Sequence, residues 1–118
     1  MPNRSKIKGT RVEREITKLL TELGLEAKRV PLSGAVGGDL SGDIHIKLPC
    51  YSEKFIAEVK ARKTSLLTVR KWLNNKDMLF VQDNRQEPLV IMPFKTFEQL
   101  MLIYKYQEIA GEQESIVC

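Results

Sequence analysis

The first half of the chain changes from a helical to an alternating pattern of apolar residues. From Thr10 onward, apolar side chains recur at the spacing of one helix face, and Gly24 marks a plausible end of that helix. Residues 25–31 are typical of a strand. Residues 33–42 contain four glycines and two serines, which predicts an irregular loop. We expect another group to approach the backbone of this loop closely. The helical face is formed by Val12, Ile16, Leu19, Leu20 and Leu23.

A β-hairpin is predicted next. Residues 43–48 alternate between polar and apolar side chains, residues 49–53 supply a turn, and residues 54–62 read as the partner strand. The alternation directs Ile44 and Ile46 toward the core, so the polar residues between them face the other side. The pattern therefore predicts an antiparallel pair with one polar face.

Residues 66–73 predict a short helix, capped by Thr64 or Ser65. The helix is amphipathic and carries the only tryptophan, Trp72. We expect Trp72 to lie in the core, and stacking on a nucleic-acid base is the less favoured alternative.

The last third of the chain predicts two more strands and a final helix. Residues 78–81 and 89–92 are apolar runs separated by a polar turn, typical of buried strands in a covered sheet. Thr96 and Gln99 match a capping box, so the final helix is expected to start near Thr96. Apolar residues cover more than one face of this helix, which indicates either a dimer contact or a groove within the same domain. Those residues are Phe97, Leu100, Met101, Ile103, Tyr104 and Tyr106.

Length and charge narrow the function classes. A chain of 118 residues with 42% hydrophobic content suits one compact domain. The net charge of +4 favours polyanions such as nucleic acid, although ordinary solubility charge explains it equally well. The two cysteines are isolated, which indicates neither a disulfide framework nor a zinc site, and no signal peptide or membrane-spanning run is seen. We therefore expect a soluble, cytoplasmic protein.

Three residues of the hairpin carry the candidate chemistry. Glu58 and Lys60 are two positions apart in the second strand, so both project from one side. If the strand that begins at Asp43 pairs alongside, a second carboxylate reaches the same area. Two hard oxygen ligands beside an ammonium group are typical of a metal-dependent phosphodiesterase. The alternative is a solvated strand face with a cross-strand charge pair worth roughly 0.2–1 kcal/mol.

Other polar residues have two interpretations each. Glu13 has capping-box spacing from Thr10, and it could instead assist a metal site from the start of the helix. Arg11 and Arg14 could clamp a phosphate or be solvated. The lone histidine, His45, is assigned no catalytic role. A further basic group could form a phosphate track or a solvated helix end, and it comprises Arg62, Lys63, Arg70 and Lys71.

The combined motifs resemble those of the archaeal-type Holliday junction resolvases, within the PD-(D/E)xK nuclease superfamily. The resemblance spans about residues 8–100 and rests on Gly9-x-x-x-Glu13-Arg14, Ser33-Gly34, Gly42-Asp43-Ile44 and Glu58-Val59-Lys60-Ala61-Arg62. It implies an α/β fold with a restriction-endonuclease-like core, in which helices flank a central mixed sheet of about five strands. It also implies a homodimer that cuts four-way DNA junctions with Mg²⁺, for which Mn²⁺ could substitute.

Site residues follow from the same resemblance. Asp43 and Glu58 would be metal ligands, with Glu13 assisting, and Lys60 would orient or polarise the attacking water. Ser33 would lie near the active site on a loop that meets DNA. The chain departs from the family pattern at Gly42, where a proline is common, and Asp39 could compete with Asp43 as ligand. The DNA-contacting set would comprise Lys6, Lys8, Arg11, Arg14, Ser33, Gly34, Arg62, Lys63, Arg70 and Lys71.

We therefore predict a flexible basic arm at residues 1–9, a nuclease domain at residues 10–111 and a tail at residues 112–118. Two alternatives to junction resolution remain open. One is a related nuclease or nickase that acts on other DNA. The other is a non-catalytic module that binds DNA or a protein.

Overall fold

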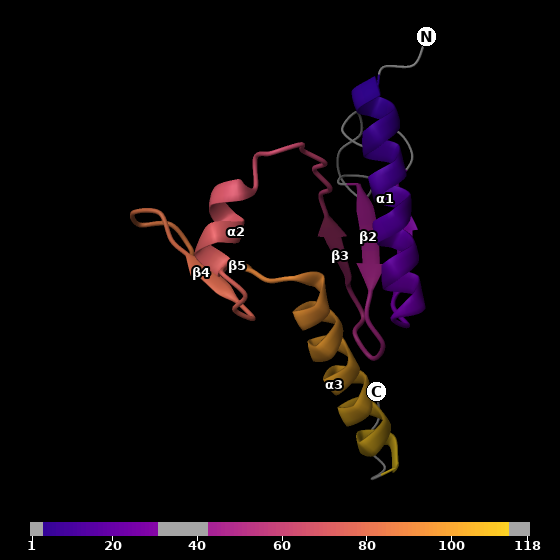
Figure 1. Cartoon of the computed structure of the whole chain (residues 1–118). Coiled ribbons are helices and arrows are strands. Elements are labelled where there is room, and N and C mark those ends of the chain that lie inside the picture. The colour runs from indigo at the N-terminus through magenta and orange to yellow at the C-terminus, as the bar shows by residue number, and fades with distance from the viewer. Residues whose placement is uncertain (1–3, 31–42, 114–118) are drawn as a thin grey trace. The chain divides into compact units, whose positions relative to one another are not determined.

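The computed structural model describes the backbone of residues 4–30 and 43–113 (Figure 1). This part of the chain is a small α/β structure with three helices, a three-stranded sheet and a two-stranded sheet. Its residues divide into one compact unit of residues 4–30, 43–61 and 108–113 and a second of residues 62–107. In chain order the elements are α1 (Arg4–Glu22), β1 (Glu26–Arg29), β2 (Ile44–Lys47), β3 (Lys54–Ala57), α2 (Leu67–Leu73), β4 (Leu79–Val81), β5 (Leu89–Ile91) and α3 (Phe94–Gln113).

Helix α1 ends where the sequence indicated, but it begins earlier. Gly24 adopts a left-handed backbone with φ 97°, which a glycine reaches without a steric penalty. The amide of Leu25 then donates to the carbonyl of Leu20 at 3.1 Å, the wide bond of a Schellman cap, and both leucines are buried. At the other end the helix starts at Arg4, so Thr10 is an interior residue and not its N-cap.

The three-stranded sheet has the order β1-β2-β3, and all its pairs are antiparallel. Helix α1 packs on β1, and Ile44 at the start of β2 is completely buried. The predicted hairpin is confirmed, because Ile44 of β2 pairs with Ala57 of β3. Alternation then separates the face that carries Arg29 and Ile44 from the face that carries Lys28 and His45.

The expectation of one mixed sheet of about five strands is wrong for the described residues. Strands β4 and β5 pair only with each other, antiparallel, in the second unit. Each described strand pairs with a strand adjacent to it in sequence, whereas a parallel pair would need a crossover connection. The hydrophobic pattern located each strand, but β3 ends at Ala57 and not at residue 62, and the pattern could not assign the strands to a common sheet.

The second unit is more open than its apolar sequence indicated. Trp72 of α2 is 60% exposed instead of lying in the core, and Phe80 and Leu89 of the hairpin are exposed as well. Leu66 precedes α2 without any side-chain cap, so the predicted cap by Thr64 or Ser65 is wrong. The left-handed Asn74 ends this helix.

Helix α3 begins at Phe94, directly after Pro93, and not near Thr96. Thr96 is buried inside the first turn, and its amide donates to the carbonyl of Pro93 at 3.0 Å. The predicted capping box is therefore wrong, because Thr96 already belongs to the helix.

The turn between β2 and β3 contains Cys50, at a positive φ of 61°. Cys50 is disulfide-bonded, and no described cysteine is free. The sequence analysis had treated the two cysteines as isolated, so this expectation is wrong. Spacing along the chain does not show which residues meet in space.

Candidate active site

Asp43 lies at the end of the three-stranded sheet, immediately before β2, and is only 7% exposed. Its carbonyl accepts the amide of Val30 at 2.9 Å, and its own amide donates to the carbonyl of Ala57 at 2.8 Å. The backbone of Asp43 is thus hydrogen-bonded to the segment that follows β1 and to the end of β3. This fixes the position from which its carboxylate projects.

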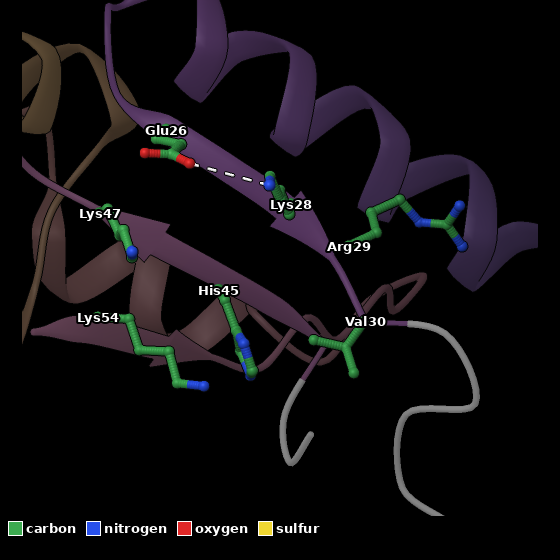
Figure 2. Close-up of a pocket in the computed structure, with 7 residues that line it drawn as sticks. All are labelled: Glu26, Lys28, Arg29, Val30, His45, Lys47 and Lys54. Carbon is green, nitrogen blue, oxygen red and sulfur yellow. Dashed lines mark ion pairs between the residues drawn. The ribbon is translucent and has the colours of Figure 1, made fainter. Parts of the chain in front are cut away.

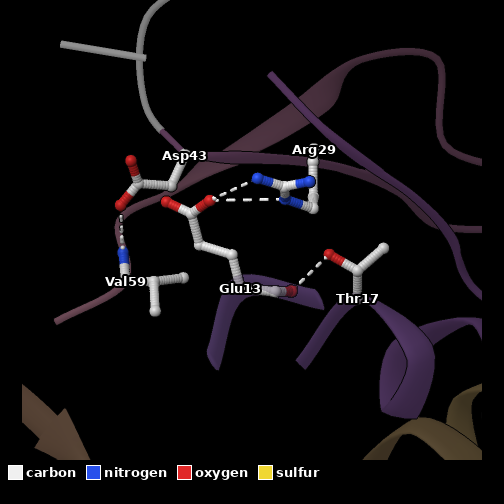
Figure 3. Close-up of polar contacts among 5 residues, drawn as sticks. All are labelled: Glu13, Thr17, Arg29, Asp43 and Val59. Atoms are coloured by element: carbon white, nitrogen blue, oxygen red, sulfur yellow. Dashed lines mark hydrogen bonds and ion pairs between the residues drawn. The ribbon is translucent and has the colours of Figure 1, made fainter. Parts of the chain in front are cut away.

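The Asp43 carboxylate is held against the Glu58-Val59-Lys60 segment. Its Oδ2 atom accepts the backbone amide of Val59 at 2.6 Å (Figure 3). Hydrogen bonds from a backbone N–H to a carboxylate are short and about twice as strong as neutral ones. The carboxylate predicted as a metal ligand is therefore oriented by the residue between Glu58 and Lys60.

Glu13 reaches the same area from α1. Its Oε2 atom accepts hydrogen bonds from Arg29, at 3.3 Å from Nε and 3.1 Å from Nη2. The side chains of Glu13 and Arg29 are 15% and 32% exposed, so the pair is largely shielded from water. In Figure 3 the Glu13 carboxylate points toward that of Asp43. The capping-box interpretation of Glu13 is wrong, because α1 runs through Thr10 and Glu13 pairs with a strand residue instead.

Glu58 and Lys60 follow β3, which ends at Ala57, so their predicted place within the strand is wrong, but their side chains still meet. The Oε1 atom of Glu58 lies 3.4 Å from Nζ of Lys60, and the side chains are 55% and 64% exposed. Their ion pair is in water, so it contributes about 0–1 kcal/mol to folding and leaves both groups available to a ligand.

The site thus consists of two pairs, Glu13 with Asp43 and Glu58 with Lys60, joined through the Val59 amide. Among the residues that the structure describes, no group of three or more His, Cys, Asp or Glu side chains is arranged to hold a metal ion. The ligand set of Glu13, Asp43 and Glu58 therefore stays a prediction.

The donor atoms of this site fit a divalent cation. Glu13 and Asp43 offer carboxylate oxygens, and Mg²⁺ is commonly held by one or two carboxylates together with substrate phosphates and water. One guanidinium, that of Arg29, offsets part of their combined charge.

Sequence reasoning missed two groups of the site, the Arg29 side chain and the Val59 amide. A signal for Arg29 was present, because the alternation of β1 places it with Ala27 on the side where α1 packs. A cation on that side of a sheet needs a carboxylate from the helix. The role of the Val59 amide had no sequence signal, since it depends on where the pairing of β2 and β3 ends.

The predicted DNA-contacting residues are distributed over both units. Arg11 and Arg14 are exposed on α1, where Arg11 lies 3.8 Å from Glu15. Lys6 and Lys8 belong to α1, but their side chains are not described. Ser33, Gly34 and the competing Asp39 lie outside the described residues. The remaining members of the predicted set are exposed in the second unit, and they are Arg62, Lys63, Arg70 and Lys71. Contact of this set with DNA stays a prediction.

Within the described ranges, no helix is long and apolar enough to cross a membrane. No curated protein and no solved structure matches the sequence.

A family model does match. It is described as "Phage putative PDDEXK endonuclease" and covers residues 4–77, which is more than half of the chain. The matched range contains both pairs of the site together with Arg29 and Val59. Nucleases of the PD-(D/E)xK superfamily generally use Mg²⁺ or a similar divalent metal, in agreement with the oxygen donors described above. The chain therefore belongs to the phage PDDEXK endonuclease family, within the PD-(D/E)xK superfamily.

Proposed function

We propose that this protein is a Mg²⁺-dependent endodeoxyribonuclease that cuts four-way DNA junctions by phosphodiester hydrolysis. The observation that carries the proposal is the position of the Asp43 carboxylate, which is bonded to the amide between Glu58 and Lys60 and toward which the Glu13 carboxylate points. The segment that carries Glu58 and Lys60 is thereby bonded to the Asp43 carboxylate at the end of the sheet.

The proposed role of each site residue follows from its environment. Asp43 and Glu13 would hold the ion, and exposed Glu58 could join them when substrate arrives. A bound divalent ion supplies Lewis-acid polarisation of the scissile phosphate and makes a coordinated water more acidic. Arg29 orients Glu13, the Val59 amide orients Asp43, and Lys60 neutralises charge that develops on the phosphate.

The preference for a four-way junction rests on the resemblance to archaeal-type resolvases. The family match to phage endonucleases also supports a second candidate, a nickase or nuclease that acts on other DNA. Both candidates share the chemistry of the site and differ only in the DNA that reaches it. A substrate comparison separates them.

We expect the purified protein with Mg²⁺ to nick a synthetic four-way junction at least about tenfold faster than a linear duplex of the same sequence. Excess EDTA should abolish cleavage of both, because Asp43 and Glu13 then lack the ion that polarises the phosphate. Single-turnover cleavage of end-labelled strands measures both rates.

The controls separate the parts of the proposal. Equal rates on junction and duplex would remove the junction preference and leave the nuclease. Absence of cleavage with either Mg²⁺ or Mn²⁺, in a protein that still binds DNA, would favour the non-catalytic binding module.

We also propose that the protein is a homodimer, because paired cuts need two sites. Helix α3 supports this with exposed apolar side chains at Leu102, Ile103 and Tyr106, which follow one stripe of the helix. Contiguous exposed apolar surface of this kind is typical of a protein interface.

Ile103→Lys is expected to convert the dimer into a monomer of 13.5 kDa, because a lysine would be desolvated in the contact. Light scattering over a range of protein concentrations measures the mass. Gln99→Lys is the matched control, since Gln99 is an exposed polar residue of the same helix. A wild-type monomer at all concentrations would contradict the dimer.

A further inference from the structure

The short helix α2 presents the only tryptophan of the chain, Trp72, to solvent. Trp72 is 60% exposed, and within the described ranges its indole takes part in no ring contact. Tryptophan is highly buried on average in folded proteins, because its large ring contributes much apolar area to a core. An exposed tryptophan therefore indicates a ligand contact more strongly than an exposed leucine does.

The segment around Trp72 is positively charged. Residues 62–76 contain five lysines and arginines and no aspartate or glutamate. Lys63, Arg70 and Lys71 are exposed, and none of the three is in an ion pair with a described residue. The partial negative charge at a helix C-terminus favours Arg70 and Lys71, but it does not explain Lys63, which precedes the helix. The cations around Trp72 are thus available to an anionic ligand.

Other exposed aromatic residues have different surroundings. Tyr51 and Phe55 stack on each other, with ring centroids 5.1 Å apart and an interplanar angle of 12°, so each ring covers one face of the other. Phe80 lies in an apolar strand, and Tyr106 belongs to the apolar stripe of α3. Trp72 combines an open ring with a segment that contains no carboxylate.

The pocket on the three-stranded sheet carries charge without such a ring. It has a volume of about 270 Å³, and no Phe, Tyr or Trp side chain lines it (Figure 2). Glu26 lines it as well, and its Oε1 atom lies 3.9 Å from Nζ of Lys28. A surface of this kind does not offer a large aromatic face to a base, whereas α2 does.

An aromatic ring beside cations matches nucleic acid whose bases are unstacked. Aromatic side chains stack on bases of any sequence, and lysine and arginine bind the neighbouring phosphates. Inside a continuous duplex both faces of each base pair are covered by the adjacent pairs. An open base face occurs where stacking is interrupted, as at a branch point or in a single strand. A protein partner is less favoured, because lysine is depleted in protein interfaces.

We propose that Trp72 stacks on an open base face of branched or single-stranded DNA, while Lys63, Arg70 and Lys71 contact the adjacent phosphates. The inference rests on the proposed nuclease function, which supplies DNA as the ligand. It assigns a residue that distinguishes interrupted from continuous DNA. The carboxylate site does not make this distinction, since it acts on a phosphate that is alike in both. Trp72 would therefore determine specificity without being a catalytic residue.

Intrinsic fluorescence tests the contact directly, because all tryptophan emission comes from Trp72. With EDTA present to prevent cleavage, a four-way junction should quench this emission and shield the indole from acrylamide. A linear duplex with the same number of base pairs should do neither. A single-stranded oligonucleotide in a parallel titration shows which source of an open base face is used.

Two results of this experiment would overturn the proposal. One is quenching by the duplex as strong as that by the junction and the single strand. The other is a change of emission and of acrylamide access with protein concentration in the absence of DNA. That change would show that a second copy of the chain covers Trp72.

Trp72→Ala is expected to weaken junction binding roughly tenfold and duplex binding by less than about twofold. Fluorescence anisotropy of labelled DNA, measured with EDTA present, gives both affinities. The matched control is Leu67→Ala, because Leu67 lies on the same helix and is 59% exposed but has no aromatic ring. It should leave the ratio of the two affinities unchanged. A loss of junction preference in Leu67→Ala equal to that in Trp72→Ala would overturn the stacking contact.

The salt dependence of binding separates stacking from charge. Arg70→Ala/Lys71→Ala should weaken junction and duplex binding alike and reduce the slope of log affinity against log salt by about 1.8. Trp72→Ala should leave this slope unchanged, because stacking releases no counterions. Trp72→Phe should recover part of the junction preference, since a smaller ring can still stack. A slope reduced as much in Trp72→Ala as in the double variant would contradict the proposal.

These measurements do not require cleavage. If no condition yields cleavage but Trp72→Ala still loses the junction preference in binding, the nuclease proposal fails and the base contact stands. If the protein cleaves DNA and Trp72→Ala binds junction and duplex as the original chain does, the base contact fails and the nuclease stands.

Discussion

Asp43→Asn is expected to lower the rate of DNA cleavage by about 10²–10³-fold or more, while DNA affinity in EDTA stays within about twofold of the original. The substitution removes the negative charge that would bind the metal. It retains a side-chain oxygen that can accept the Val59 amide, so the local structure should persist. Single-turnover cleavage and anisotropy on the same junction measure the two quantities.

Two further variants sharpen this result. Asp43→Ala also removes the acceptor of the Val59 amide, so it should lower the free energy of unfolding by about 1–3 kcal/mol in addition to abolishing cleavage. Glu13→Gln removes a carboxylate that would help to hold the metal, so it should reduce cleavage. Its amide oxygen can still accept a hydrogen bond from Arg29, so it should lower the free energy of unfolding less than Asp43→Ala does. If Asp43→Asn kept most of the wild-type rate, the Asp43 site would not be the catalytic centre.

Lys60→Ala is expected to reduce cleavage by about 10²–10³-fold without a measurable change in thermal stability. The two effects separate because Lys60 is 64% exposed and pairs with Glu58, which is also mostly in water. Such a pair contributes little to folding, whereas an ammonium beside a phosphate stabilises charge that develops during hydrolysis. Cleavage under single-turnover conditions and thermal unfolding followed by circular dichroism test the two parts.

Lys18→Ala serves as the control, because Lys18 is an exposed lysine of α1 that belongs to neither of the two pairs of the site. It should leave both cleavage and stability unchanged. Lys60→Arg keeps the charge but changes its geometry, so partial activity would indicate that charge alone supplies part of the effect. A loss of stability in Lys60→Ala similar to its loss of activity would show that Lys60 is structural.

Local features of this chain were predictable from sequence because they depend on neighbours along the chain. Gly24 ends α1 because only its own backbone conformation is needed. Glu58 and Lys60 meet because two positions along an extended segment share a side. The β2–β3 hairpin followed from alternation with a short turn, and the turn restricts the pairing to an antiparallel register.

Features that depend on distant segments were predicted less well. The residues from Thr10 match the capping-box pattern, but no cap forms there because the helix extends back to Arg4. The apolar patterns of α2 and the β4–β5 hairpin predicted burial, yet Trp72 and Phe80 are exposed. An apolar pattern indicates that one face of a helix or hairpin can be buried. It does not indicate which other segment of the chain packs against that face.

The sequence by itself determined the identity and order of the acidic and basic groups, the hairpin that carries them, and the pairing of Glu58 with Lys60. Only the tertiary structure decided that Glu13 pairs with Arg29 and points to Asp43, and that Asp43 accepts the Val59 amide. The reason is physical. Alternation within a strand sets the side of each residue, but the packing of α1 on the sheet and the end of the β2–β3 pairing decide which of those residues meet.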